Sequence, residues 1–157
     1  ARRTGIPVNG AAQHGTWSSR PLPTDGTDEH GLGLIDEATC VRLLSHGHIG
    51  RLGLSVGSLP VVLPVNYLLH DHTIVFRSED GDKTRAAELG SVACLEIDHF
   101  DLFEHSGWSV LATGRLSIAP TDRAAAYDRL PVVPWAPQQS SRFVELSVEL
   151  VSGRSIR

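Results

Sequence analysis

The sequence contains few cysteines, almost no lysine and no long apolar run, and each shortage excludes a class of protein. Only Cys40 and Cys94 are cysteines among 157 residues, and neither lies at the spacing of a zinc or disulfide motif. No window approaches the roughly 18 consecutive apolar residues of a membrane helix, and no apolar segment typical of a secretion signal follows the N-terminus. We therefore expect a cytoplasmic protein that has no membrane partner.

Positive charge is also sparse. Lys83 is the single lysine, acidic residues outnumber basic ones by 18 to 14, and the formal net charge is −4 at pH 7. Because binding to nucleic acid through its phosphates requires a basic stripe or patch, we expect no nucleic-acid partner. The content of 41% hydrophobic and 20% charged residues is instead typical of one folded domain with a sizeable core.

The chain divides into a leader and a domain. Residues 1–33 are rich in Gly, Pro, Ser and Thr without a sustained hydrophobic period, which predicts an irregular or disordered leader before a folded domain over residues 34–157. In the domain we predict short helices at 36–47, 82–90 and 121–130 and apolar strands at 48–56, 59–70, 72–78, 91–100, 107–119 and 142–153. Such a pattern indicates a mainly β fold, a small antiparallel barrel or a sandwich.

Pro64 interrupts the second predicted strand. Proline has no N–H to donate to a neighbouring strand, so it is confined to edges and bulges of sheets. We therefore expect the strand at 59–70 to lie at an edge, or to carry a bulge, where Pro64 occurs.

Residue types that bind phosphate gather between a predicted strand and a predicted helix. Arg77 and Ser78 end the strand, and Lys83 and Thr84 open the helix after the acidic turn 79–82. Arginine offers a planar fork of donors, lysine a point charge, and the hydroxyls and first helical N–H groups add further donors, so the cluster can hold a phosphate. The alternative is an ordinary surface turn in which the two cations pair with the acidic residues between them.

Other catalytic patterns are weaker. Histidines recur two residues apart at 46/48 and 70/72, but no carboxylate or cysteine joins them at a ligand spacing, so we predict no metal site. Asp101, His105 and Ser109 are the residue types of a catalytic triad, but no strained nucleophile turn positions them. No glycine-rich nucleotide loop and no G-x-S-x-G motif occurs.

The order of segments carries more information than any one of them. In succession the chain contains GRLGLS, LPVVLPVNYLL, IVFRSEDGDK, VACLEIDHFD and SGWSVLATGRL, followed by PWAP and VSGRSIR. This succession resembles the pyridoxamine 5′-phosphate oxidase-like family of flavin-binding proteins, from about Cys40 to the C-terminus. The resemblance implies a six-stranded antiparallel split β-barrel that forms a homodimer, with two cofactor sites between its chains. It also implies FMN as the cofactor, with the deazaflavin coenzyme as the alternative.

The resemblance also implies roles for particular residues. Arg77, Ser78 and Lys83 look like the clamp for the FMN phosphate, with Thr84 as a weaker addition. The residues expected along the isoalloxazine ring, where the break at Pro64 frees backbone groups, are Val62, Leu63, Pro64, Val65 and Asn66. Trp108 and Ser109 correspond to a position near the flavin or the dimer interface, although an indole there can equally pack in a core.

The function implied is that of a flavoprotein oxidoreductase that moves a hydride to or from a small organic substrate. Since the cofactor supplies the chemistry, no catalytic residue is assigned to the protein. Apart from Arg154, the chain lacks the additional C-terminal positions that hold substrate phosphate in pyridoxamine phosphate oxidases, so we do not expect vitamin oxidation. Two alternatives are a carrier or sensor that binds flavin or haem without turnover, and a structural dimer whose charged cluster is a plain surface turn.

Overall fold

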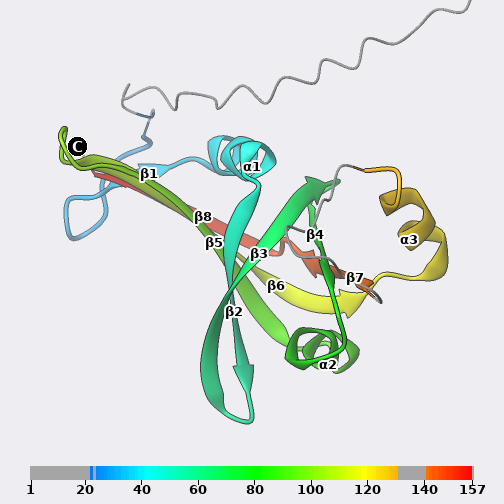
Figure 1. Ribbon diagram of the computed structural model, residues 1–157. Coiled ribbons are helices and arrows are strands. Elements are labelled where there is room, and N and C mark those ends of the chain that lie inside the picture. The colour runs from blue at the N-terminus through cyan, green and yellow to red at the C-terminus, as the bar shows by residue number, and fades with distance from the viewer. Residues whose placement is uncertain (1–21, 23, 131–140, 157) are drawn as a thin grey trace, which may run out of the picture.

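The computed structural model describes residues 22, 24–130 and 141–156, which contain eight strands and three short helices (Figure 1). In chain order they are β1 (Gly33–Ile35), α1 (Glu37–His46), β2 (Ile49–Val56), β3 (Leu59–His70), β4 (Thr73–Ser78), α2 (Asp82–Glu88), β5 (Val92–Asp101), β6 (Ser106–Ile118), α3 (Thr121–Tyr127), β7 (Arg142–Ser147) and β8 (Leu150–Ile156). In this part of the chain no helix has both the length and the apolar character needed to cross a membrane.

Six of the strands close into an antiparallel barrel, which confirms the predicted fold class. The strands follow one another in the order β6, β5, β2, β3, β4 and β7, and β7 pairs again with β6. Two strands serve both halves of the barrel: β3 pairs first with β2 and then with β4, and β6 pairs with β5 and β8 before it reaches β7. The remaining strands, β8 and β1, extend the sheet beyond β6 (Figure 1).

The single strand predicted at 142–153 is wrong, because the chain forms two strands there. β7 pairs with β4 and with the end of β6, whereas β8 pairs with the first part of β6. The change of partner occurs at Val148 and Glu149, whose N–H groups donate to the carbonyl oxygens of His72 and Thr113 at 3.0 Å each. Apolar and polar residues alternate from Leu146 to Leu150, across the boundary between the two strands, so this pattern does not reveal that the hydrogen-bonding partner changes.

β6 can change partner because of Gly114. Its pairing with β8 ends at Thr113, and its pairing with β7 begins at Leu116. A Cβ atom on Gly114 would overlap the backbone carbonyl of Ser147 in β7. Closure of the barrel therefore depends on the close backbone approach that glycine allows.

The two faces of β4 belong to different apolar clusters. Ile74 and Phe76 point into the barrel, where they join the main core together with inward residues of the other strands and of α1. Val75 points outward and packs with Phe143 of β7 and with Tyr127 of α3, which covers this part of the barrel surface. Side chains alternate along a strand, so Arg77 shares the outer face with Val75.

Residues 24–32, which lie in the predicted leader, form a loop beside β8. Its backbone bonds include Asp25 N to Leu34 O and Leu34 N to Gly26 O, both 2.9 Å. Asp28 accepts a hydrogen bond from Arg154 Nε at 2.9 Å, and this bond is the main reason that the pKa of Asp28 is below its usual value. Arg154, the one C-terminal candidate for holding a substrate phosphate, is thus paired within its own chain. Most of the predicted leader, residues 1–21 and 23, lies outside the described residues.

Candidate functional site

The segment expected along a flavin ring lies at an open edge of the barrel, as Pro64 predicts. Over residues 59–66, β3 pairs with β2 and with no other described strand. Tyr67 N donates to His48 O at 3.0 Å, and alternate residues of an antiparallel strand direct their backbone groups to opposite edges. The N–H and C=O groups of Val62 and the C=O group of Pro64 therefore point to the unpaired edge, whereas Asn66 lies next to Tyr67, where the pairing with β4 begins. Pro64 also lies on this edge, so its missing N–H removes no bond from the sheet.

Side-chain alternation divides the five ring-lining candidates into two sets. Leu63 and Val65 turn towards the barrel core, where Val65 is buried. Val62, Pro64 and Asn66 point to the outer face, and the side chain of Val62 is exposed. A ligand against this edge would therefore contact the side chains of Val62, Pro64 and Asn66. It would contact only the backbone of Leu63 and Val65.

Arg77 is held on the outer face of β4 with part of its guanidinium unsatisfied. Its Cζ lies 4.7 Å from the centre of the Phe143 ring, and its Nη2 lies 3.6 Å from Asp128 Oδ1, just beyond α3. Its Nε is buried and has no hydrogen-bond partner among the described residues. A buried donor without a partner is costly, and the Arg77 side chain as a whole is 32% exposed, so a ligand can reach part of it.

The two hydroxyls of the predicted clamp serve the protein itself. Ser78 is buried, and its Oγ donates to the carbonyl oxygen of Glu79 at 2.9 Å. The Oγ1 of Thr84 accepts from Gly81 N and donates to Gly81 O, both at 2.9 Å, and so caps α2. Lys83 is half-buried and forms no ion pair with any described residue. Arg77 and Lys83 are thus the two members of the predicted clamp whose side chains form no bond to the turn between them in the described residues.

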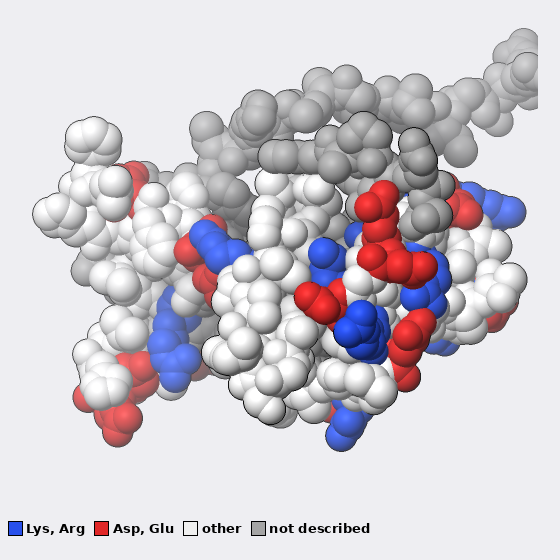
Figure 2. Space-filling model, turned by 60° about the horizontal axis from the view of Figure 1, so that its bottom comes forward, with Lys and Arg blue, Asp and Glu red and all other residues white. Residues whose placement is uncertain are grey.

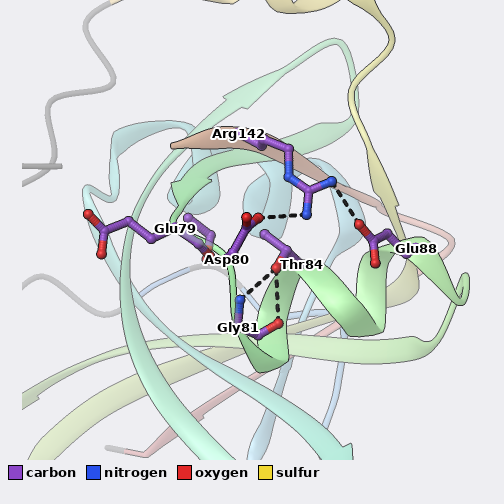
Figure 3. A network of polar contacts seen from close by, with 7 residues as sticks. Glu79, Asp80, Gly81, Thr84, Glu88 and Arg142 are labelled. Atoms are coloured by element: carbon purple, nitrogen blue, oxygen red, sulfur yellow. Dashed lines mark hydrogen bonds and ion pairs between the residues drawn. The ribbon is translucent and has the colours of Figure 1, made fainter. Parts of the chain in front are cut away.

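Arg142 was missed by sequence reasoning, yet it organises the acidic turn that precedes α2. From the start of β7, its Nη2 donates to Asp80 Oδ1 and its Nη1 to Glu88 Oε1, each at 2.8 Å (Figure 3). Asp80 is 62 residues away in sequence, so no local motif announces the pair. In the described residues Arg77 pairs with Asp128, and neither Arg77 nor Lys83 pairs with the acidic turn.

Trp108 and Ser109 lie on opposite faces of β6. Trp108 belongs to the core cluster, and the centre of its ring system lies 6.3 Å from that of His99. Ser109 is half-buried on the outer face, opposite Asp98 of β5 and Arg154 of β8. The structure therefore does not bring this pair to one ligand surface.

Acidic and basic side chains alternate on the face of the molecule that carries α2. Figure 2 shows Lys and Arg next to Asp and Glu there, without a large patch of a single sign. Among the described residues, no group of three or more His, Cys, Asp or Glu side chains is arranged to hold a metal ion.

A second polar cluster, also missed by sequence reasoning, lies where α3 meets β7. Glu145 is buried and accepts hydrogen bonds from Arg123 Nε and Nη2 at 2.7 and 2.8 Å and from Tyr127 Oη at 2.8 Å. The cluster lines a cavity of about 450 Å³ on the outer face of β6 and β7. Because Glu145 is fully paired, the cluster fastens α3 to the barrel, and the end of α3 in turn places Asp128 against Arg77.

The hydroxyl of Tyr127 makes the cluster sensitive to alkaline pH. Burial, followed by the hydrogen bond to Glu145, raises the pKa of Tyr127 to about 12 from the usual 10.0. The unfolded chain therefore releases this proton at lower pH than the folded chain, and the free energy of unfolding falls as pH rises through this interval. We expect Tyr127→Phe to be about 1 kcal/mol less stable than the parent at pH 7, through the lost hydrogen bond, but to lose less stability above pH 10. Urea unfolding at several pH values measures both effects, and parallel pH profiles for the two proteins would contradict this account.

The fold is that of a small split-barrel protein. Six strands close into the barrel, and part of β3 pairs with β2 alone and leaves an edge open. Two cations lie nearby in the chain, at the end of β4 and the start of α2. Residues 36–155 match the sequence profile of the pyridoxamine 5′-phosphate oxidase family, and the chain belongs to this family.

The chain is also similar to individual proteins of known sequence or structure. An uncharacterized protein of Mycobacterium tuberculosis is 30% identical over 125 residues, which cover 76% of this chain and 82% of that protein. A conserved protein of unknown function from Corynebacterium diphtheriae has a solved structure that matches with a TM-score of 0.67 at 28% identity, over 80% of this chain and 98% of that one. An FAD-binding protein from Mycobacterium smegmatis matches with a TM-score of 0.66 at 24% identity, over 79% of this chain and 99% of that one.

Proposed function

We propose that the chain binds a flavin nucleotide and uses it to transfer a hydride to or from a small organic substrate. The observation that carries the proposal is the state of Arg77, whose guanidinium is stacked on Phe143 while its buried Nε lacks a partner among the described residues. The contact with Phe143 restrains the guanidinium before any ligand binds, so little side-chain entropy is lost when it binds a phosphate oxygen. Lys83, which has no counter-ion among the described residues, would add the second positive charge.

The edge of β3 is the proposed position of the ring. The N–H and C=O groups of Val62 and the C=O group of Pro64 offer a donor and acceptors for the polar edge of an isoalloxazine, and the exposed side chain of Val62 offers an apolar contact. When bound, the flavin would supply the two-electron chemistry. The protein would then bind and orient it and exclude water from one face of the ring.

FMN is the cofactor that the chain is proposed to prefer, with the deazaflavin coenzyme as the alternative. Solved structures with this fold include FAD-binding proteins and a protein that binds both FAD and haem, so FAD is a further candidate. These flavins share a phosphate attached to the chain that carries the ring, and this is the group that Arg77 and Lys83 would recognise.

The proposed partner of the chain is a second copy of itself. The candidate edge on β3 covers at most one face of a ring, and family membership favours a site completed by another chain. The outer face of the sheet also exposes apolar side chains that such a contact would bury, among them Val92, Leu111 and Leu150, which are 57%, 39% and 71% exposed. A homodimer would remove this apolar surface from water.

Anaerobic reduction tests the proposed activity. The protein saturated with FMN is mixed with NADPH or NADH, the flavin absorbance is followed, and the mass in solution is measured by sedimentation. Bleaching of the flavin by a dimeric protein, faster than that of free FMN, is the expected result. Bound flavin that neither donor reduces would favour a carrier or sensor, and a protein that retains no flavin would overturn the proposal.

A further inference from the structure

We propose that Arg142 is a positioning residue of the flavin site, which binds Asp80 and so holds its negative charge away from the ligand phosphate. This inference rests on the proposed function, because it concerns the phosphate that Arg77 and Lys83 would bind. It assigns a specific role to a residue of β7 that lies outside every motif of the sequence.

The turn before α2 is electrostatically unfavourable for a phosphate. Glu79, Asp80 and Asp82 stand between Arg77 and Lys83 in the chain, so carboxylates outnumber cations there. The side chain of Asp80 is 82% exposed and free to move unless something binds it. Repulsion between like charges a few ångströms apart is comparable to the thermal energy even in water, so a free carboxylate here would weaken phosphate binding.

Arg142 is placed to remove this repulsion. It lies directly opposite Ser78, the last residue of β4, in the pairing of β4 with β7. Figure 3 shows its guanidinium between the carboxylates of Asp80 and Glu88, with Asp80 turned towards Arg142 and Glu79 extended in the other direction. The next residue of β7, Phe143, supports the guanidinium of Arg77. Two consecutive residues of β7 thus set both sides of the proposed clamp.

The ion pairs of Arg142 with Asp80 and Glu88 contribute little to the free energy of unfolding. An electrostatic role of Arg142 can therefore be distinguished from a structural one. The side chains of Arg142, Asp80 and Glu88 are 42%, 82% and 51% exposed. Ion pairs in such positions stabilise proteins weakly, because water and salt screen them. Loss of Arg142 should therefore change the affinity for a phosphate-bearing ligand much more than it changes the melting temperature.

The test compares FMN with riboflavin, which has the same ring but no phosphate. Binding to the full chain is measured by quenching of flavin fluorescence at low ionic strength. Arg142→Gln is expected to weaken FMN binding about fivefold, because it leaves the charge of Asp80 unpaired beside the phosphate. Riboflavin binding is expected to stay unchanged. Adding Asp80→Asn to Arg142→Gln removes the repelling charge and should restore the affinity for FMN.

Glu88→Gln is the matched control. It removes the other carboxylate that Arg142 binds but leaves the bond to Asp80, so the affinity for FMN should match that of the parent. The inference is overturned if Arg142→Gln binds FMN as the parent does, if it weakens FMN and riboflavin equally, or if Asp80→Asn fails to restore binding. A parent protein that binds no FMN would instead overturn the proposed function, and this result is distinct because it precedes any substitution.

Discussion

Replacement of both Arg77 and Lys83 by alanine is expected to weaken FMN binding at least about a hundredfold, since a hydrogen bond to a charged group contributes about 1.5–3 kcal/mol. Among the described residues, Arg77 has only a 3.6 Å ion pair with the exposed Asp128 and Lys83 has no counter-ion, so neither group gives up a strong bond when it binds a phosphate. The change is measured by fluorescence titration with FMN. The single variants should each lose part of the affinity.

A charge-matched control accompanies the double variant. Arg85 of α2 and Arg129, which follows α3, are exposed cations outside the proposed clamp. Replacing both with alanine changes the net charge by the same amount and should leave FMN affinity within about twofold of the parent, as expected for screened surface charges. Parent-like affinity in the Arg77/Lys83 variant would remove the clamp. An equal loss in the control would show that overall charge, and not a specific site, governs binding.

Gly114→Ala is expected to cost more than about 3 kcal/mol of the free energy of unfolding, a large part of the 5–15 kcal/mol typical of a domain. The added Cβ would overlap a backbone carbonyl at Ser147, so no change of side-chain rotamer can relieve the contact. Either β7 separates from β6, which opens the barrel, or β6 shifts against β5 and β8. Thermal melting followed by circular dichroism measures the effect.

Gly81→Ala provides the comparison for this substitution. A Cβ at Gly81 meets nothing within 4 Å, and the backbone there is extended, so alanine fits without strain. We expect a loss of less than about 1 kcal/mol, because alanine is a poorer residue than glycine at a helix N-cap. If Gly114→Ala melts close to the parent, the close approach of β6 and β7 is not what closes the barrel.

Local periodicity predicts most of the fold and one feature of the site. Alternating apolar residues predict β2 to β6, and Pro64 predicts an unpaired edge where β3 carries one. The same period of two also implies that Leu63 faces away from Pro64 and Trp108 away from Ser109. The family resemblance implied residues 62–66 and the pair Trp108 and Ser109 as ligand contacts, and each of these sets includes residues from both faces of its strand.

Other features depend on contacts that no local pattern encodes. The hydroxyl of Thr84 looks like a phosphate ligand in the sequence, but the fold uses it to cap α2. The partners of Arg142 and of Glu145 lie on elements distant in the chain, so only the closed barrel brings them together. The division of residues 142–153 into β7 and β8 likewise follows from which neighbouring strand is within reach.

A titration of the protein with two flavins shows directly whether the chain binds a flavin through its phosphate. Flavin-free protein is titrated into FMN and, separately, into riboflavin, and the quenching of fluorescence is recorded. We expect saturable binding of one FMN per chain, with riboflavin bound at least about tenfold more weakly because it lacks the charged group. Equal affinity for the two ligands, or no binding of either, would contradict the proposal that the chain binds a flavin through its phosphate.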